Sequence, residues 1–167
     1  MSMMDAPAYD PRSESTKKAL IWAIPALILL TAVFGVAGFA LGHGWFFTNL
    51  AAEHKVNGFF SALEAKDYGK AFALYTSDSD YAQHPDKHKD YPLDRFTEDW
   101  TKESPVGGPI LAHHVDISKT DGSGTFGTGI IVAVRVDTAT VKDKKLFMWY
   151  QKSDGTLTEP APHILQY

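Results

Sequence analysis

Residues 19–42 read ALIWAIPALILLTAVFGVAGFALG, an apolar run of 24 residues without a charged side chain. As an α-helix this run extends about 36 Å, and the hydrocarbon core of a bilayer is about 30 Å thick. Backbone amides in lipid must be satisfied within their own segment, so a single segment crosses as a helix. Pro25 falls in the early turns of that helix, where its missing N–H donor costs least. The run predicts one transmembrane helix in contact with a lipid bilayer.

The charges on either side of the run predict its orientation. Arg12, Lys17 and Lys18 precede it, and the next cation after it is Lys55. An excess of basic residues marks the cytoplasmic side of a membrane segment. We therefore expect a single-pass protein of an inner (plasma) membrane of the bacterial type. Its N-terminus is cytoplasmic, and the chain from about His43 onward is periplasmic or otherwise extracytoplasmic.

Lysines precede the run, and aromatic side chains lie near both of its ends. Tryptophan and lysine are typical of the headgroup level of a bilayer. The expected membrane-interface anchors are Lys17, Lys18, Trp22, Trp45 and Phe46.

A cleaved signal peptide is the alternative interpretation, with a cleavage region in residues 37–40. The run is, however, longer than the roughly 7 to 15 apolar residues of a signal peptide. The polar leader before it also carries acidic as well as basic residues.

The apolar run also contains small residues at helical spacing. Gly38 and Gly42 form a G-x-x-x-G pair, and Thr31 lies four residues before Gly35. Such spacing lets a neighbouring helix approach closely. It predicts a helix–helix contact, although glycine is also simply common in membrane helices.

The remaining chain has the size and composition of one domain. Residues 43–167 carry 13 basic and 17 acidic side chains, and this mild acidity makes nucleic acid an unsuitable partner. The chain has no cysteine, which excludes disulfides, thiolate zinc sites and cysteine catalysis. No cofactor or metal is expected. The predicted organisation is a disordered cytoplasmic leader (1–18), a transmembrane helix (19–42), an interfacial juxtamembrane segment (43–49) and an extracytoplasmic domain (50–167).

Within the domain, the hydrophobic pattern changes from helical to extended. Apolar residues recur every three or four positions across residues 50–76, which predicts two consecutive helices with a break at Lys66–Asp67 and Asp67 as a cap. A polar loop follows at 77–90, and a third helix is expected over 91–103. Strands are expected over 110–118, 127–138, 144–152 and, as a short last strand, 163–167.

The second predicted strand, over 127–138, has one purely aliphatic face. Its even positions, Ile130 to Val136, are all aliphatic, so this face should lie under the helices. Helices followed by an antiparallel meander make an α+β fold.

Two stretches carry a family resemblance. VNGFFSALEAKDYGKAFALYTSD (56–78) resembles the opening of domains of the nuclear transport factor 2-like superfamily, and KLFMWYQKSDGT (145–156) resembles their last paired strands. The resemblance covers about residues 50–167. It implies a cone of three helices packed on a strongly curved antiparallel sheet, often with a pocket at its wide end and often dimeric through the sheet.

The resemblance does not select an activity. The superfamily includes isomerases, dehydratases, polyketide cyclases and non-catalytic binding or accessory domains. This chain also departs from the usual closing strand, because Leu157 is followed by Thr-Glu-Pro-Ala-Pro. Proline cannot donate to a sheet ladder, so the last strand should be irregular or an edge strand.

His113 is the candidate acid or base. Strand alternation places it on one face with Leu111, Val115 and Ile117, turned toward the helices. A histidine there can act in proton transfer if a carboxylate orients it, with Asp78, Asp80 or Asp94 as candidates. The alternative is a core histidine bonded to a tyrosine or a carbonyl.

Other motifs give weaker indications. A ligand pocket would be lined by Tyr75, Trp100, His113 and Trp149, although aromatic residues at these spacings also suit a core or a dimer interface. His84 and His88 are four apart, but Pro85 leaves His84 outside any helix, so a solvated loop is expected there and not a metal site. Residues 122–127 match G-x-G-x-x-G without the helix that nucleotide binding requires, and predict a hairpin loop.

Together these patterns predict a membrane-anchored accessory or assembly protein, with other membrane-protein subunits or a homodimer as partners. Tethering concentrates a small domain beside membrane complexes. The alternative is a small-molecule binder or an isomerase- or dehydratase-like enzyme that uses His113. A third interpretation is a dimeric structural module, with a broad hydrophobic sheet face around Phe147, Trp149 and Ile131.

Overall fold

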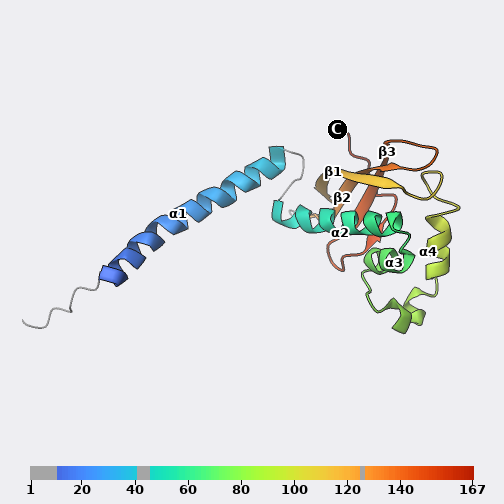
Figure 1. Ribbon diagram of the computed structural model, residues 1–167, viewed down its shortest axis with the longest axis horizontal. Helices are drawn as coiled ribbons and strands as arrows, with labels where there is room; N and C mark the ends of the chain where they lie inside the picture. Colours follow the sequence, from blue (N-terminus) through green and yellow to red (C-terminus); the bar gives the residue numbers. More distant parts are fainter. Residues whose placement is uncertain (1–10, 41–45, 125–126) are drawn as a thin grey trace, which may run out of the picture. The chain divides into compact units, whose positions relative to one another are not determined.

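The computed structural model describes residues 11–40, 46–124 and 127–167. The chain forms two compact units, which divide between Ala37 and Gly38. The helices are α1 (Pro11–Ala40), α2 (Phe46–Glu64), α3 (Tyr68–Thr76) and α4 (Leu93–Asp99), and the strands are β1 (Ala112–Asp121), β2 (Gly129–Asp137), β3 (Lys144–Gln151) and β4 (Leu157–Thr158). The second unit is α+β, as predicted (Figure 1).

Helix α1 is longer than the predicted membrane segment. It begins at Pro11, eight residues before Ala19, so residues 11–18 are helical where a disordered leader was expected. Proline suits the first position of a helix, and the lysines at 17 and 18 are good helix formers. Residues 1–10 lie outside the described residues. The segment Ser15–Gly38 is long and apolar enough to cross a membrane.

Helices α2 and α3 meet as the sequence predicts. Helix α2 ends at Glu64, and Lys66 turns the chain with a φ of 58°. The Asp67 side chain then caps α3 by accepting a hydrogen bond from the Lys70 backbone N–H at 3.0 Å. Because α2 begins at Phe46, residues 46–49 of the expected juxtamembrane segment are helical. Residues 43–45 of that segment lie outside the described part of the chain.

The third helix of the domain is shorter than expected. Helix α4 begins after the extended Pro92 and ends at Asp99. The backbone N–H groups of the next four residues, 100–103, donate hydrogen bonds to the Glu98 carbonyl in successive turns. The loop before α4 contains two short 3-10 turns, Tyr81–Gln83 and Pro85–His88.

The sheet is an antiparallel meander in the order β1-β2-β3-β4. The first three strands lie where the sequence predicts them, within three residues at each end. The last strand does not: β4 pairs Leu157 with Tyr150 and Thr158 with Trp149, and the predicted strand at 163–167 is absent from the described chain. Pro160 and Pro162 lack the N–H groups that a continuing ladder needs.

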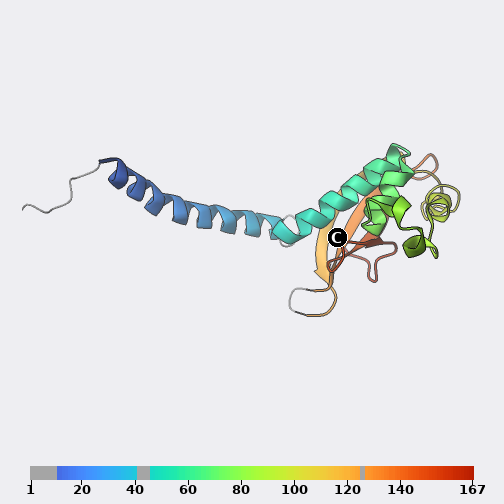
Figure 2. The same cartoon turned by 90° about the horizontal axis from the view of Figure 1, so that it is seen from below.

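The inner face of the sheet carries the hydrophobic core. As predicted, Ile130, Val132, Val134 and Val136 all belong to one buried cluster with residues of the helices. Helix α2 lies beside β1 and β2 in both views (Figures 1 and 2). The rings of Phe59 and Trp100 meet edge-to-face at 5.1 Å, and Phe72 and Phe96 at 5.4 Å. Such aromatic pairs fill space and add directional attraction.

A β-bulge at Asp116 reverses the alternation along β1. The register passes from Val115 opposite Val134 to Ile117 opposite Ala133, so Asp116 is the extra residue. His113 remains on the inner face and Val115 packs against the core. Beyond the bulge, Ser118 takes the inner position that simple alternation gives to Ile117. Leu111, which precedes β1, is exposed and does not share the inner face.

Candidate functional site

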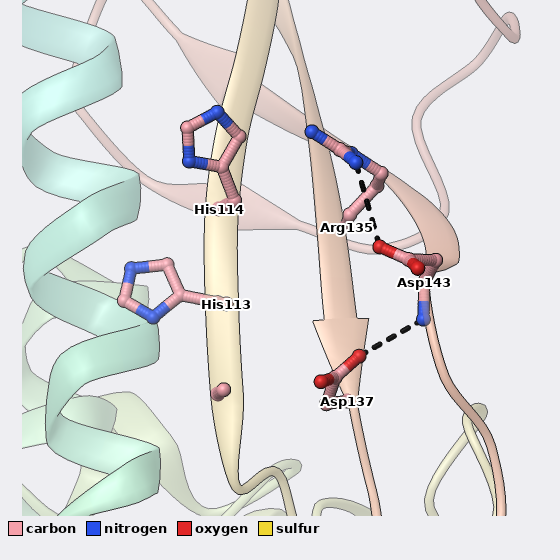
Figure 3. A pocket seen from close by; sticks show the side chains of 6 residues that line it. His113, His114, Arg135, Asp137 and Asp143 are labelled. Atoms are coloured by element: carbon pink, nitrogen blue, oxygen red, sulfur yellow. Dashed lines mark hydrogen bonds and ion pairs between the residues drawn. The ribbon is translucent and has the colours of Figure 1, made fainter.

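His113 lies between β1 and helix α2. Its side chain is only 7% exposed and its ring stacks on Phe60, with 5.6 Å between the ring centroids. Its Nδ1 lies 2.5 Å from Oε1 of Glu64, and its Nε2 lies 3.0 Å from Oδ1 of Asn57. Figure 3 shows the ring turned toward the helix beside β1. Asn57, Phe60 and Glu64 are spaced by three and four residues, which places them on one face of α2.

This arrangement differs from the one expected for a proton-transfer residue. The orienting carboxylate is Glu64, near the end of α2, and not Asp78, Asp80 or Asp94. A general base needs a ring nitrogen within reach of its substrate. Here oxygen atoms of α2 engage both nitrogens of His113. The contacts favour a histidine that holds β1 against α2, with a carboxylate and an amide as partners in place of the expected tyrosine or carbonyl.

The four residues of the expected pocket are not brought together. Trp100 is buried among Phe59, Phe60 and Phe96, and Tyr75 packs beside Phe96 with 5.5 Å between centroids. Trp149 projects from the opposite face of the sheet, because Leu146 and Met148 of the same strand point into the core. Its indole lies over Gly129, in the space that a Cβ at that position would need.

A small surface pocket lies where β1 begins and β2 ends. Its volume is about 130 Å³, and its lining is Ala112, His113, His114, Arg135, Asp137 and Asp143 (Figure 3). Sites for drug-sized ligands usually enclose about 300 to 1,000 Å³. Arg135 Nη1 is 3.4 Å from Asp143 Oδ1, and Lys142 Nζ is 3.0 Å from Asp137 Oδ2. The charges that line this pocket are therefore paired within the domain.

Asp116, the bulge residue, is the centre of a polar cluster that the sequence did not reveal. Its side chain is 8% exposed and contacts Arg135 through Nε at 2.9 Å and Nη2 at 2.7 Å. The hydroxyl of Tyr167 donates to Asp116 Oδ2 at 2.6 Å. The sequence signal was an arginine among the aliphatic residues at 130–136.

The contacts of this cluster shift the pKa values of Asp116 and Tyr167. Burial alone would raise the pKa of Asp116, but the hydrogen bonds from Arg135 and Tyr167 outweigh burial and lower it. Burial and the bond to Asp116 raise the pKa of Tyr167. The cluster thus holds a charged carboxylate, a charged guanidinium and a neutral phenol at neutral pH.

A second polar cluster organises the loop before α4. The Asp78 side chain, 6% exposed, accepts contacts at 3.0 Å from His84 Nδ1, Lys87 Nζ and His88 Nε2. Hydrogen bonds from His88 and then Lys87 hold the pKa of Asp78 well below its usual value. His84 is exposed as expected, but His88 is mostly buried and packs edge-on against Phe72, so the loop is more ordered than a solvated one.

Asp78 does not form a metal site with these histidines. The Lys87 ammonium contacts the same Asp78 oxygen, Oδ2, as the two histidine rings, so a cation bound there would have to compete with it. Within residues 11–40, 46–124 and 127–167, no group of three histidine, aspartate or glutamate side chains is arranged to hold a metal ion.

Lys55 joins three elements of the domain. Its Nζ donates to the carbonyl of Gly155 at 2.6 Å and to Oγ of Ser77 at 3.0 Å. Burial lowers the pKa of Lys55, and the negative charge of Asp154 offsets this shift only in part. Ser77 adopts a left-handed conformation with a φ of 56° at the end of α3. Lys55 therefore links α2, the end of α3 and the turn before β4.

The residues proposed for membrane contact fall partly within α1. Lys17, Lys18 and Trp22 lie in the helix, with Trp22 largely exposed. The Thr31 hydroxyl donates to the Leu27 carbonyl at 2.8 Å, and space around Gly35 is open. Gly38 also lies in α1. Gly42 and Trp45 lie outside the described residues, and so does the side chain of Phe46.

Comparisons of the chain with protein-family models, with curated proteins and with solved structures gave no significant match.

Proposed function

We propose that this chain is a single-pass membrane-anchored accessory or assembly protein that acts on or within a membrane complex. Its N-terminus is cytoplasmic and its folded domain lies on the extracytoplasmic side of an inner membrane. The observation that carries the proposal is α1, whose segment Ser15–Gly38 is long and apolar enough to cross a membrane and whose large apolar side chains, such as Leu29 and Phe34, are exposed. Helices with such a surface are stable when lipid or another membrane helix covers it.

The domain is proposed to be a nuclear transport factor 2-like cone. Three helices on one side of an antiparallel sheet support that proposal. Fold alone does not choose between binding and catalysis in such a superfamily. The choice therefore depends on the residues at the site.

The residues favour a non-catalytic role. The inner face is filled by large aromatic side chains, including Phe59, Phe60 and Phe96. His113 has both ring nitrogens engaged by α2. A tether gains little for the processing of a diffusible metabolite, but it raises the effective concentration of a domain beside membrane partners.

The proposed contact within the membrane is the stripe of Thr31, Gly35, Gly38 and Gly42. The first three lie in α1. A partner helix that packs there gains van der Waals contact through close backbone approach.

The test is extraction of the tagged full chain from its native membrane in mild detergent, followed by native sizing and identification of what migrates with it. We expect co-migration with a larger assembly at fixed stoichiometry. Gly38→Leu should reduce that co-migration, whereas Ala26→Leu, on the opposite side of the helix, should leave it unchanged. A chain that migrates alone contradicts the proposal.

The alternative function, a small-molecule binder or isomerase- or dehydratase-like enzyme, rests on one observation. His113 and Glu64 are in direct contact at 2.5 Å, as in an acid–base pair oriented by a carboxylate. This function requires Asn57 to release Nε2 when a ligand enters. It predicts that a screen of small carbonyl compounds finds one that raises the melting temperature of the wild-type domain. The same compound should leave the melting temperature of His113→Gln unchanged.

A further inference from the structure

The last residues of the chain cross the outer face of the sheet. After β4, the backbone N–H of Ala161 donates to the carbonyl of Phe147 at 2.7 Å, so the chain still follows β3. His163 Nδ1 then lies 2.7 Å from Oδ2 of Asp121, at the end of β1. We call residues 162–167 the strap. Its end lies beside the strands in both views (Figures 1 and 2).

The strap ends in a site that fits a phenol. The Tyr167 hydroxyl donates to Asp116 at 2.6 Å, and Arg135 holds that carboxylate from its other side. The ammonium of Lys145 lies 3.8 Å from the centre of the Tyr167 ring, which is a cation–π distance. Lys145 and Arg135 are paired across β3 and β2, so the site is part of the outer face.

Apolar residues of β2 lie beneath this path. Ile131 and Ala133 are buried, although they face away from the inner core of Ile130 and Val132. Contacts of the strap with β1 on one side and with Lys145 of β3 on the other place it across β2. The hydrophobic outer face expected around Phe147, Trp149 and Ile131 is thus present, but the chain itself helps to cover it.

The strap is held mainly at two points. The His163–Asp121 pair is exposed, and Ile164 presents 71% of its surface to solvent. An exposed side-chain contact of this kind adds little to stability, and a single hydrogen bond such as that of Tyr167 adds only modestly. Segments with so few buried contacts open locally at low free-energy cost.

We propose that residues 162–167 are an exchangeable strap, which closes the outer face of its own sheet or that of a second copy of the chain. We expect the partner to be a second copy of the chain, because its Tyr167 is identical to the one that Asp116, Arg135 and Lys145 already surround. Exchange of an identical segment between copies needs no new contact surface.

Anchoring supplies the driving concentration, so this inference rests on the proposed function. When the chain is dilute in solution, its own strap is present at its sheet at an effective concentration of the order of millimolar. It therefore outcompetes the straps of other copies for that sheet. Copies confined to one membrane surface meet at a local concentration far above that of a dilute solution, so a second copy's strap competes better there. Reciprocal exchange in the membrane is therefore expected, with mostly self-closed chains after dilution.

The test uses the absence of cysteine from the chain. His163→Cys is placed in full-length chains with one tag and Asp121→Cys in full-length chains with another, and both are reconstituted into the same lipid vesicles. A short bis-maleimide crosslinker joins the two cysteines only where a strap lies on the other copy's sheet. We expect a crosslinked dimer that carries both tags, and its loss when the vesicles are dissolved and diluted in detergent before crosslinking.

Controls separate the strap from chance collisions and from failure of the anchor. Lys142→Cys, an exposed position at the other end of the sheet, replaces Asp121→Cys and should give little dimer. A chain with both His163→Cys and Asp121→Cys should crosslink internally after dilution. If it does so, yet no two-tag dimer forms in vesicles, exchange is overturned.

Flotation of the vesicles before crosslinking reports the anchor independently. Chains that float without exchanging overturn this inference and leave the proposed anchoring intact. Chains that do not float overturn both. A doubly substituted chain that fails to crosslink internally overturns the path of the strap itself.

Discussion

Helix α1 and the domain that follows it are both rich in apolar side chains, but these side chains are exposed in α1 and buried in the domain. Leu29 in α1 is 67% exposed, and its apolar neighbours along the helix are exposed as well. In the domain, Phe59, Phe60 and Phe96 are completely buried. The domain buries these side chains in its own core, whereas α1 exposes them, as does a helix that is long and apolar enough to cross a membrane. Under the proposed function, the first set of side chains folds the domain and the second anchors it.

The largest expected effect is loss of a core aromatic residue. Phe96→Ala removes a ring that contacts Phe59, Phe72 and Trp100, and should lower the free energy of unfolding by about 3 to 5 kcal/mol. Urea unfolding followed by tryptophan fluorescence measures the change. Leu29→Ala, a truncation of similar kind in α1, should leave the unfolding of the domain unchanged. Equal effects of the two substitutions would break the comparison.

A charge in α1 should act on location and not on folding. Leu29→Arg places a cation near the middle of the apolar helix, at a cost of about 2.5 to 3.5 kcal/mol for insertion. The fraction of chain that floats with membranes should fall severalfold, while the melting curve of the domain stays the same. Leu29→Ile is the matched control and should float like the wild type. A parallel drop in domain stability would contradict this separation.

Alanine substitutions at two glycines of the domain should change its stability in opposite directions. A Cβ at Gly129 would collide with the indole of Trp149, so Gly129→Ala should destabilise the domain by about 1 to 3 kcal/mol. Gly58, in the interior of α2, has only an ordinary contact with Leu74, and Gly58→Ala should stabilise by about 0.5 to 1 kcal/mol. Thermal unfolding compares the pair, and a shift in the same direction for both would be inconsistent with the packing of Trp149.

A smaller effect is expected at the strap. Tyr167→Phe removes the hydroxyl that donates to Asp116 and should cost about 0.5 to 1.5 kcal/mol, because Arg135 still pairs with that carboxylate. Hydrogen exchange at residues 163–167 should become faster. Ile164→Ala, an exposed position in the same segment, should have almost no effect. Unchanged exchange in Tyr167→Phe would mean that the phenol does not hold the strap.

The last prediction concerns the slope of stability with pH. The pKa of Asp78 is lowered in the folded state, so its contribution is complete above the usual value of 3.8 and is lost as the pH falls toward the lower folded value. Wild type should therefore be more stable than Asp78→Asn at pH 7, and the difference should shrink below pH 3.8. Urea unfolding over a pH series checks this. A difference that stays constant down to low pH would contradict the assignment of Asp78.

Local patterns predicted much of the fold. The break between α2 and α3 and the cap at Asp67 follow from helical spacing and a capping residue that lie within a few positions of each other. The aliphatic face of β2 is apparent because its even positions repeat one residue class. These features depend on neighbours in the sequence, which is why they can be read from it.

Features that depend on distant contacts were not predictable. The bulge at Asp116 has no signature within β1, yet it moves Ile117 to the outer face. Glu64 reaches His113 only because α2 packs along β1, a contact across 49 positions of the chain. The strap has no periodic pattern, and its tie between Tyr167 and Asp116 joins residues 51 positions apart. Each arises from tertiary packing.

The central claim, that α1 anchors the folded domain, is tested most directly by the intact mass of the chain recovered from native membranes after an alkaline wash. The account predicts that the chain stays in the membrane pellet with a mass that includes α1. A shortened chain released to the soluble fraction, beginning after the small residues near the end of α1, would identify a cleaved signal sequence and contradict it.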